Sequence, residues 1–547
     1  MSESKVYSAR SVFDGLKKIF HQYLEAQYHI WDEGLIAERQ RLLDQPGVSF
    51  QEPRLEATPF YATGAHYRQL SIPKAAQDIL TLASTRPRAG IYSEPYAHQA
   101  SALEAVLNRD EEIIVATGTG SGKTECFLMP ILGSLAIESA QRSESWKMPG
   151  VRALLLYPMN ALVNDQLARL RRLFGDEQIA LALRGGRERN ATFGMYTSRT
   201  PYPGHATAAK NRERIGDLLK HLFHGLSDES QTLLKNEGKW PAKDIERFAG
   251  SLFQTGANDC ELFSRQEMQR TSPDLLVTNY SMLEYMLLRP IERSIFEQTA
   301  RWLESDQDNR FTVVLDEAHM YRGSGGAEVA YLLRRLHSRL GVKRDRVRYI
   351  LTSASLGSGA EATVRIKRFA ADLTGLENAT RSFVLITGSP EQKDGQRTAS
   401  RSEATALAAY EFGTLHRMHE APSATEAALR ELLGGLRFPL PQGAQDQDDL
   451  RNLVQQWLTQ FGPAALAANR ITSMPEPLRT VAEYVFPDCE SQERAMESLL
   501  ALMSFAKDKK SARVFAPVRS HLFFRGLPGL YACVNPKCPL CQTSCRL

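Results

Sequence analysis

Residues 111–130 read EEIIVATGTGSGKTECFLMP, and this stretch decides the fold of the chain. The apolar run at 113–116 is typical of a strand that is buried on both faces of a parallel sheet. A glycine-rich loop follows, and glycine permits backbone angles at which successive N–H groups surround an anion. Lys123 adds a positive charge, and the hydroxyl of Thr124 can ligate magnesium where the next helix begins. The stretch therefore predicts a loop that binds the phosphates of a nucleoside triphosphate.

The loop departs from the usual pattern G-x-x-x-x-G-K-[ST] at Thr117, which stands where the first glycine is expected. A glycine-rich turn without a ligand is the alternative interpretation. The order of strand, loop, Lys-Thr and helix favours ATP binding, because the core T-G-S-G-K-T is intact. The loop residues expected to contact ATP are Thr119, Gly120, Ser121, Gly122, Lys123 and Thr124.

A second stretch, residues 311–319, reads FTVVLDEAH, an apolar strand that ends in two adjacent carboxylates. Open parallel sheets bind ligands at the carboxyl ends of their strands. We expect Asp316 to hold the magnesium ion that Thr124 also contacts, and Glu317 to deprotonate the attacking water, with Lys123 as the third catalytic residue. An acidic loop after a strand is the alternative, but the phosphate-binding loop in the same chain favours catalysis.

Further apolar segments alternate with helical sequence, which predicts an α/β fold with a doubly wound parallel sheet. The expected strands are 153–157, 179–183, 275–278, 313–315 and 349–352. The composition is ordinary for a globular chain of 547 residues, and its net charge of +4 permits a nucleic-acid partner without requiring one. No apolar run approaches the roughly 18 to 20 residues that cross a bilayer, and no secretory signal begins the chain, so we expect a cytoplasmic protein without a membrane partner.

These motifs together resemble those of the superfamily 2 helicases, the DEAD/DEAH-box class. The segment at 96–99 resembles the adenine-reading segment of that class, which implies that Tyr96 and Gln99 contact ATP. YPMNALVNDQ at 157–166 resembles motif Ia, LLVTNYSML at 275–283 a later strand-end motif, and TSAS at 352–355 the S-A-T motif. The resemblance implies a RecA-like P-loop ATPase lobe that uses ATP and Mg²⁺ and acts as a helicase or translocase.

The same resemblance assigns further roles along the nucleic-acid track. His319, Ser353 and Ser355 would couple the state of the nucleotide to the track. Asn160, Thr278 and Arg322 would contact nucleic acid, since small polar side chains at strand ends can hold phosphates without reading bases. Each of these three is otherwise an ordinary loop residue.

The segment MYRGSGGAEVAYLLRRL at 320–336 is similar to the one after DEAH in the branch of the Hrq-like and mitomycin-repair helicases. The large helicases of antiphage systems such as DISARM and Druantia lie near the same branch. The resemblance favours DNA as the substrate and leaves RNA open, and antiphage defence and DNA repair are both open as pathways.

The sequence contains no Q-x-x-G-R-x-G-R type motif, with which the second lobe of such helicases supplies arginines to the cleft. Because an arginine finger is worth several orders of magnitude in rate, we expect weak hydrolysis by this chain alone. The chain is therefore interpreted as the N-terminal part of a longer helicase, with the second motor lobe in the missing part or in partner subunits.

Four of the seven cysteines cluster near the end of the sequence: Cys533, Cys538, Cys541 and Cys545. Four thiolates can close a tetrahedral zinc site, or two of them can belong to a zinc ribbon that is incomplete here. An iron–sulfur cluster and unliganded cysteines are the other interpretations.

Four regions are expected along the chain. They are an N-terminal helical preface at 1–50, a RecA-like lobe at 51–375 with an insertion at about 187–270, a mainly helical region at 376–510 that starts a second lobe or forms an accessory domain, and a cysteine-rich metal-binding module at 511–547.

The sequence thus predicts an ATP-dependent DNA helicase or translocase. One alternative is a nucleic-acid-gated ATPase switch that recruits partners without unwinding. A P-loop kinase or transporter ATPase is a second alternative, but it leaves Gln99, the DEAH segment and the TSAS segment unexplained.

Overall fold

The computed structural model describes residues 8–118, 120–184, 189–201, 216–217, 219, 221–223, 225–250, 254–353, 360–376, 383–418, 420–438 and 447–526. The chain divides into two compact units. One unit, called here the sheet unit, contains Tyr61–Ser389. The other, called here the helical unit, combines the chain before residue 61 with the chain after residue 389.

The sheet unit is built on an eight-stranded sheet in the order β5-β4-β6-β3-β7-β8-β2-β9, with every pairing parallel. The strands are β2 (Ile113–Ala116), β3 (Ala153–Tyr157), β4 (Phe193–Met195), β5 (Glu261–Leu262), β6 (Leu275–Asn279), β7 (Phe311–Leu315), β8 (Val347–Ser353) and β9 (Val384–Thr387). Non-consecutive neighbours require crossover connections, which the helices between the strands provide.

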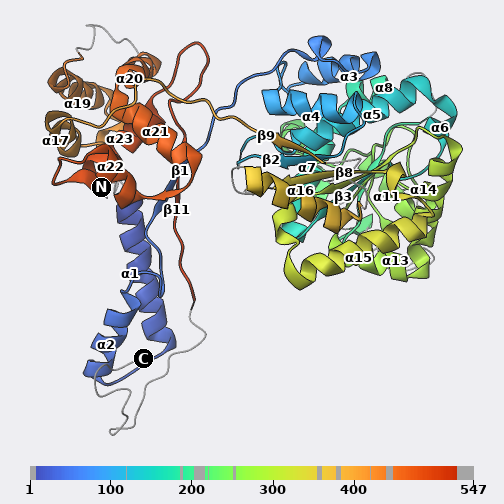
Figure 1. Ribbon diagram of the computed structural model, residues 1–547, viewed down its shortest axis with the longest axis horizontal. Helices are drawn as coiled ribbons and strands as arrows, with labels where there is room; N and C mark the ends of the chain where they lie inside the picture. Colours follow the sequence, from blue (N-terminus) through green and yellow to red (C-terminus); the bar gives the residue numbers. More distant parts are fainter. Residues whose placement is uncertain are drawn as a thin grey trace. The chain divides into compact units, whose positions relative to one another are not determined.

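Helices cover both faces of this sheet, as the two hydrophobic clusters of the unit record (Figure 1). One face carries α3 (Lys74–Ser84), α4 (Ala97–Leu107), α5 (Glu125–Gln141), α7 (Asn160–Phe174) and α8 (Glu177–Arg184). The other carries α13 (Tyr280–Leu288), α14 (Arg293–Ser305), α15 (Gly323–Leu340) and α16 (Ala360–Thr374). Along β2, Ile113 and Val115 join the first cluster while Ile114 joins the second. The predicted RecA-like, doubly wound fold class is confirmed.

One predicted strand is wrong, because residues 179–183 lie within the helix α8. Ile179 and Leu183 are buried four residues apart, whereas Leu181 between them is 55% exposed. That spacing places the two buried side chains on one helical face. A short apolar run of this kind does not distinguish helix from strand by its composition.

The expected insertion at about 187–270 contributes directly to the sheet, since β4 and β5 form one edge. Its described residues also form α10 (Asp228–Asn236), α11 (Ile245–Gly250) and α12 (Arg265–Arg270). Lys243 is fully buried there and forms ion pairs with Asp259 and Glu267. A buried cation of this kind needs paired carboxylates, so this region is packed as part of the sheet unit.

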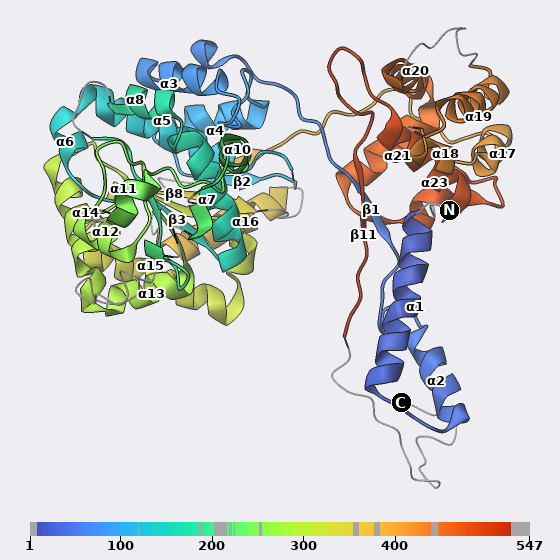
Figure 2. The same cartoon turned by 180° about the vertical axis from the view of Figure 1, so that it is seen from behind.

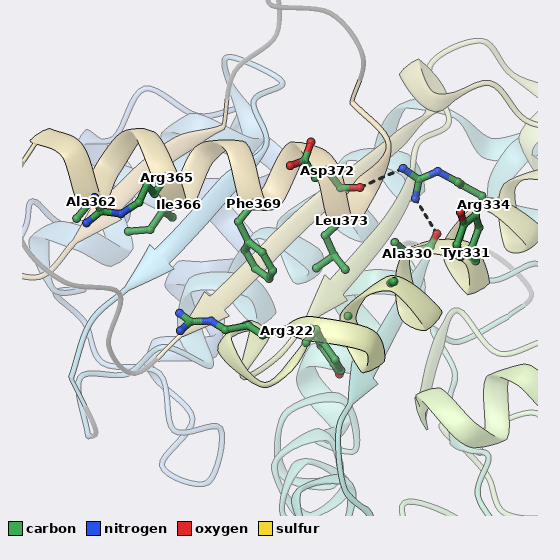
Figure 3. A pocket seen from close by; sticks show the side chains of 14 residues that line it. Arg322, Ala330, Tyr331, Arg334, Ala362, Arg365, Ile366, Phe369, Asp372 and Leu373 are labelled. Atoms are coloured by element: carbon green, nitrogen blue, oxygen red, sulfur yellow. Dashed lines mark hydrogen bonds between the residues drawn. The ribbon is translucent and has the colours of Figure 1, made fainter.

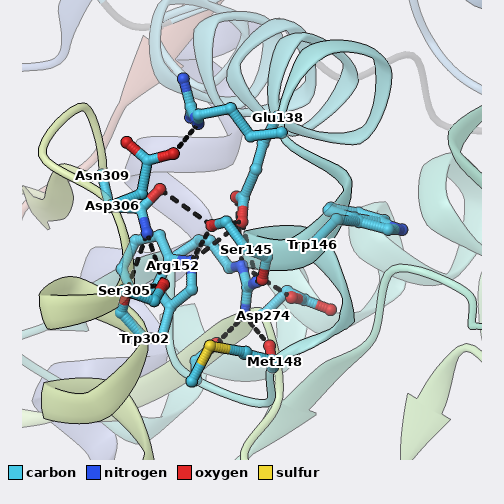
Figure 4. A network of polar contacts seen from close by, with 12 residues as sticks. Glu138, Ser145, Trp146, Met148, Arg152, Asp274, Trp302, Ser305, Asp306 and Asn309 are labelled. Atoms are coloured by element: carbon cyan, nitrogen blue, oxygen red, sulfur yellow. Dashed lines mark hydrogen bonds and ion pairs between the residues drawn. The ribbon is translucent and has the colours of Figure 1, made fainter.

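A buried polar network ties α5 and α14 to the amino-terminal end of β3 (Figure 4). The Arg152 guanidinium donates two hydrogen bonds to Glu138 and forms an ion pair with Asp274. The indole of Trp302 also donates to Glu138, at 2.9 Å. Burial favours the neutral form of Asp274, but Arg189 and Arg152 hold its pKa below the ordinary value.

The helical unit has its own core and a three-stranded antiparallel sheet, β10-β1-β11 (Figure 2). Its helices are α1 (Ala9–Gln27), α2 (Glu33–Leu43), α17 (Arg401–Ala409), α18 (Gly413–His416), α19 (Pro422–Gly435), α20 (Gln447–Gln460), α21 (Gly462–Ser473), α22 (Leu478–Val485) and α23 (Gln492–Phe505). β1 (Arg54–Ala57) pairs with β11 (Val518–His521) and with β10 (Glu476–Pro477). Among the described residues of this unit, no parallel sheet forms.

The observed division differs from the expected boundaries in two places. The preface expected at 1–50 and the first ten residues of the lobe expected at 51–375 share one unit with the chain after residue 389. Within those ten residues, β1 pairs with two strands from beyond residue 475. The start of the region expected at 376–510 belongs to the sheet unit, because β9 pairs with β2. None of the described helices is long and apolar enough to cross a membrane.

Candidate nucleotide-binding site

The candidate site lies at the carboxyl ends of three adjacent strands, β7, β8 and β2. The loop after β2 leads into α5, with Thr124 as the residue before its first turn. Gly120 and Gly122 have φ angles of 79° and 73°, a region that favours glycine. This backbone allows the loop to curve around an anion at the start of α5, where the helix dipole favours negative charge.

Gln99 fastens the beginning of α4 to this loop. Its side-chain oxygen accepts a hydrogen bond from the backbone N–H of Tyr96 at 2.9 Å, and its amide donates to the carbonyl of Gly122 at 3.1 Å. A Cβ atom on residue 122 would lie 2.3 Å from the Gln99 amide nitrogen, so a larger residue would displace the Gln99 side chain from this hydrogen bond. Both predicted base-reading residues, Tyr96 and Gln99, therefore lie beside the phosphate loop.

His98 and Thr117 hold the loop through contacts with Ser121, and the sequence did not indicate either role. The Nε2 atom of His98 donates to the carbonyl of Ser121 at 2.8 Å. The hydroxyl of Thr117 lies 2.5 Å from the hydroxyl of Ser121, and both side chains are buried. The residue that replaces the usual first glycine thus holds the loop, and Ser121 can offer a ligand its backbone N–H but not its side chain.

The DEAH segment meets the loop across the site. The ammonium nitrogen of Lys123 lies 3.9 Å from Oε1 of Glu317. Glu317 has a left-handed backbone with φ of 50°, which is uncommon for a residue other than glycine. Strained backbone of this kind often occurs where a side chain must be aimed at a functional site.

Thr352 at the end of β8 holds the two carboxylate residues in place. Its hydroxyl donates to the Asp316 carboxylate and accepts a hydrogen bond from the backbone N–H of Glu317 at 3.3 Å. Burial raises the pKa of Asp316, whereas the Thr352 hydroxyl and the Lys123 ammonium act in the opposite direction. A second cation beside Asp316 would relieve this desolvation, so the carboxylate suits a metal ligand.

The residues present fit an ATP–magnesium complex. Mg²⁺ prefers oxygen ligands, and Thr124 and Asp316 offer a hydroxyl and a carboxylate. Lys123 offers the cation and the loop offers backbone N–H groups for phosphates. Among the residues that the structure describes, no group of three or more His, Cys, Asp or Glu side chains forms a separate metal site.

The predicted coupling residues His319 and Ser353 face each other. The Ser353 hydroxyl lies 3.3 Å from Nδ1 of His319, and the same ring nitrogen lies 3.2 Å from Oε2 of Glu317. This chain of contacts joins the end of β8 to the proposed base. Ser355, Thr119 and the four clustered cysteines Cys533, Cys538, Cys541 and Cys545 lie outside the described residues.

The predicted nucleic-acid residues have different surroundings. Asn160 begins α7 and accepts a hydrogen bond from the side chain of Asn279 at 2.6 Å, a partner that the sequence did not indicate. Arg322 precedes α15, is exposed and has no ion pair with another described residue. Thr278 is fully buried and its hydroxyl donates to the carbonyl of Tyr196 at 2.6 Å. The Thr278 side chain is therefore not available to contact a nucleic-acid strand, because its hydroxyl already donates a hydrogen bond within the fold.

Residues 96–240 match the family model described as DEAD/DEAH box helicase. The chain is 45% identical to Druantia protein DruE of Escherichia coli (strain UMEA 4076-1) over 98% of this chain and 31% of that protein. It is 24% identical to ATP-dependent helicase hrq1 of Schizosaccharomyces pombe over 63% of this chain and 25% of that protein. The chain thus spans about a third or less of the length of these relatives.

Among solved structures, the DUF1998 helicase MrfA bound to DNA is 19% identical, with 76% of this chain and 48% of that chain covered and a TM-score of 0.35. The helicase Lhr of Mycobacterium smegmatis, bound to ssDNA and AMP-PNP, is 16% identical over 69% of this chain and 38% of that chain, with a TM-score of 0.34.

Proposed function

From the premise that this chain carries a DEAD/DEAH box helicase domain, we propose that it is the ATP-binding part of a DNA helicase or translocase. The observation that carries the proposal is the meeting of Lys123, Asp316 and Glu317 at one edge of the sheet. A phosphate-binding cation opposite a metal-binding carboxylate and a candidate base is the arrangement that nucleotide hydrolysis requires.

The proposed role of each residue follows from the position of its side chain. The loop N–H groups and Lys123 bind the phosphates, and Gln99 faces the base. Thr124 and Asp316 hold the magnesium ion, which supplies positive charge against the phosphate oxygens when bound. Glu317 orients the attacking water and accepts its proton. His319 contacts both Glu317 and Ser353, so a movement of Glu317 during hydrolysis would be transmitted through them to the end of β8.

DNA is proposed as the track because the residues after DEAH resemble those of the mitomycin-repair branch. Identity of 45% to a Druantia protein favours antiphage defence over DNA repair as the setting. The cytoplasm is proposed as the location, because ATP and DNA are both present there in a bacterial cell such as that of the Druantia relative. The second motor lobe, with its arginines, is proposed to come from a further part of the protein or from a partner subunit.

The test is ATP hydrolysis by the wild-type chain, Lys123→Ala and Glu317→Gln, each without nucleic acid and with single-stranded DNA, duplex DNA or RNA. We expect hydrolysis that rises with DNA and vanishes in both variants. Stimulation by RNA alone would reject DNA as the track. Hydrolysis that persists in Glu317→Gln would reject the assigned base. Nucleotide binding without hydrolysis under any condition would mean that the second lobe or a partner completes the site.

Strand displacement separates a helicase from that switch. A labelled duplex with a single-stranded overhang should be unwound when ATP is present and the missing lobe or partner is supplied. Stimulated hydrolysis without strand displacement under those conditions would favour translocation, or a recruiting role.

We also propose that Cys533, Cys538, Cys541 and Cys545 bind zinc, because four thiolates close together in a sequence are typical of structural zinc sites. Elemental analysis should find about one zinc per chain, and Cys538→Ser with Cys541→Ser should remove it. Iron in place of zinc, with visible absorption that these substitutions bleach, would identify an iron–sulfur cluster instead.

A further inference from the structure

A groove with a volume of about 900 Å³ lies between α15 and α16, on the face of the sheet unit that these helices cover (Figure 3). Its lining consists of Tyr321, Arg322, Gly323, Gly326, Ala327, Ala330, Tyr331, Arg334, Ala362, Arg365, Ile366, Phe369, Asp372 and Leu373. Neither the phosphate loop nor the DEAH carboxylates line it. The groove is therefore separate from the nucleotide site, although Tyr321 and Arg322 follow the DEAH segment closely.

The groove exists because the two helices present faces of different size. The α15 face consists of glycine and alanine up to Ala330, and Gly326 is required because a Cβ there would lie 2.4 Å from the Tyr321 carbonyl oxygen. The α16 face carries Ile366, Phe369 and Leu373 at helical spacing. Small residues opposite large ones leave a channel with an apolar floor in place of a closed helix–helix contact.

The edges of the groove are positively charged. In Figure 3, Arg365, Arg322 and Arg334 are distributed along it from one end to the other. The Arg365 side chain is 71% exposed and pairs with the still more exposed Glu361, and Arg334 donates to two backbone carbonyls. The charged side chains of the lining are these three arginines and one carboxylate, Asp372, so the groove carries a net positive charge. An anionic partner would gain from this field.

The length of the groove suits a helical segment. The lining residues of α16 run from Ala362 to Leu373, which at about 1.5 Å per residue corresponds to roughly 16 Å, or three helical turns. Tyr331, 70% exposed at the edge, offers an aromatic contact of the kind that is enriched at interfaces. A helix laid in an apolar groove binds through anchors at i, i+3, i+4 and i+7.

We propose that the groove between α15 and α16 binds an acidic, amphipathic helix of a partner protein. The apolar stripe of that helix lies against Ile366, Phe369 and Leu373, and its carboxylates face Arg365 and Arg322. Ile366 and Leu373 give the floor aliphatic surface on both sides of the single ring of Phe369, which favours the apolar stripe of a protein helix over a nucleic-acid strand, whose successive bases would each need a stacking surface. The inference does not depend on the proposed ATP hydrolysis, because none of the residues assigned to the nucleotide site lines the groove.

The probe is a capped 14-residue peptide with leucines at i, i+3, i+7 and i+10 and glutamates on the flanks, labelled for fluorescence anisotropy. Its control is the same peptide with every glutamate replaced by lysine. Binding to the full chain is compared for wild type, Ala330→Trp, which fills the groove, and Arg365→Glu, which reverses one edge charge. Val364→Trp and Arg335→Glu are matched controls on the same two helices outside the groove lining.

We expect saturable binding of the glutamate peptide, at least tenfold weaker binding to Ala330→Trp and Arg365→Glu, and little change with Val364→Trp and Arg335→Glu. The lysine peptide should bind at least tenfold more weakly than the glutamate peptide. No saturable binding of the glutamate peptide, or equal binding of both peptides, overturns the proposal. A single-stranded oligonucleotide that competes for the groove and is lost in Ala330→Trp would assign the surface to nucleic acid instead.

Discussion

The ammonium nitrogen of Lys123 lies 3.9 Å from Oε1 of Glu317, so the cation of the phosphate loop and the proposed base face the same point. In the ATP-bound protein, the phosphates would compete with Glu317 for this cation. The carboxylate therefore lowers ATP affinity to the extent that it pairs with Lys123 and repels the phosphates. Glu317 therefore has two separate effects: its carboxylate accepts the proton from water, and it repels the phosphates of bound ATP. Removing its charge should slow hydrolysis without weakening ATP binding.

Glu317→Gln should bind ATP at least as tightly as the wild type while hydrolysis falls by about 10²- to 10⁴-fold, the usual contribution of a general base. Fluorescent-nucleotide titration and single-turnover hydrolysis measure the two quantities separately. Lys123→Ala is the matched control, because it should lose affinity as well. Weaker binding in Glu317→Gln would show that the carboxylate supports the nucleotide site instead of opposing it.

Thr352→Val should lower hydrolysis by about 10- to 100-fold, as expected when a residue that orients a metal ligand is lost. The hydroxyl that it removes donates to Asp316 and accepts from the backbone of Glu317. Thr299→Val removes a buried hydroxyl that also accepts a backbone hydrogen bond, from Val151 just before the amino-terminal end of β3, the edge opposite the site. Both variants should lose about 1 to 3 kcal/mol of stability, whereas only Thr352→Val should alter hydrolysis.

Gln99→Ala should raise the KM for ATP by about tenfold, equivalent to about 1.4 kcal/mol, because the hydrogen bond from α4 to the loop carbonyl of Gly122 is lost together with the bond that Gln99 accepts from the backbone of Tyr96. Gln77→Ala on α3, which removes one side-chain hydrogen bond to the carbonyl of Leu70, is the control and should leave KM unchanged. Steady-state kinetics of ATP hydrolysis measure KM and kcat for the wild type and both variants. A fall in kcat with unchanged KM would mean that Gln99 stabilises the transition state and does not contribute to ATP binding.

The sequence predicted those parts of the site whose chemistry is local. The loop at 117–124 and the carboxylates Asp316 and Glu317 each lie within one strand-loop segment, so their residue types and spacing were sufficient. Thr352 could be assigned to a motif, but its hydrogen bond to Asp316 could not be predicted, because that contact depends on the pairing of β7 with β8. Asn279 was missed for the same reason, since its contact with Asn160 requires β3 beside β6.

The fold shows the same limit. The alternation of apolar strands with helices predicted a doubly wound sheet, but not the order of its strands or the edge formed by β4 and β5. The pairing of β1 with β11 joins residues more than 460 positions apart. Contacts of this range leave no periodic signal in the sequence, because each strand is too short to carry one.

Arg152→Met should lower the free energy of unfolding by about 3 to 5 kcal/mol, because Glu138 and Asp274 would remain buried without this partner. Arg152 lies at the amino-terminal end of β3, the edge opposite the nucleotide site, so KM for ATP should not change at a permissive temperature. Arg293→Met, which breaks an exposed pair with Glu297, should change stability by less than about 0.5 kcal/mol. Equal effects of the two substitutions would contradict the importance of the network.

His337 provides a pH-dependent contribution to stability. Burial, with Arg344 and Arg334 nearby, lowers its pKa from 6.5 to about 4, and Nε2 lies 2.7 Å from the Tyr349 hydroxyl. A lowered pKa means that the unfolded chain binds the proton more readily than the folded chain below pH 6.5. This contribution is therefore complete above pH 6.5 and is lost as the pH falls from 6.5 to 4.

The wild-type chain should lose roughly 2 kcal/mol more stability than His337→Gln between pH 7 and pH 5, as the two pKa values require. Denaturant unfolding of both proteins at pH 7, 6 and 5 measures the difference. Carboxylates titrate in both proteins and cancel in the comparison, so the excess belongs to the imidazole. Parallel stability curves would mean that His337 is protonated in the folded chain at pH 5, in which case the Tyr349 hydroxyl must accept its hydrogen bond and solvent must reach the ring.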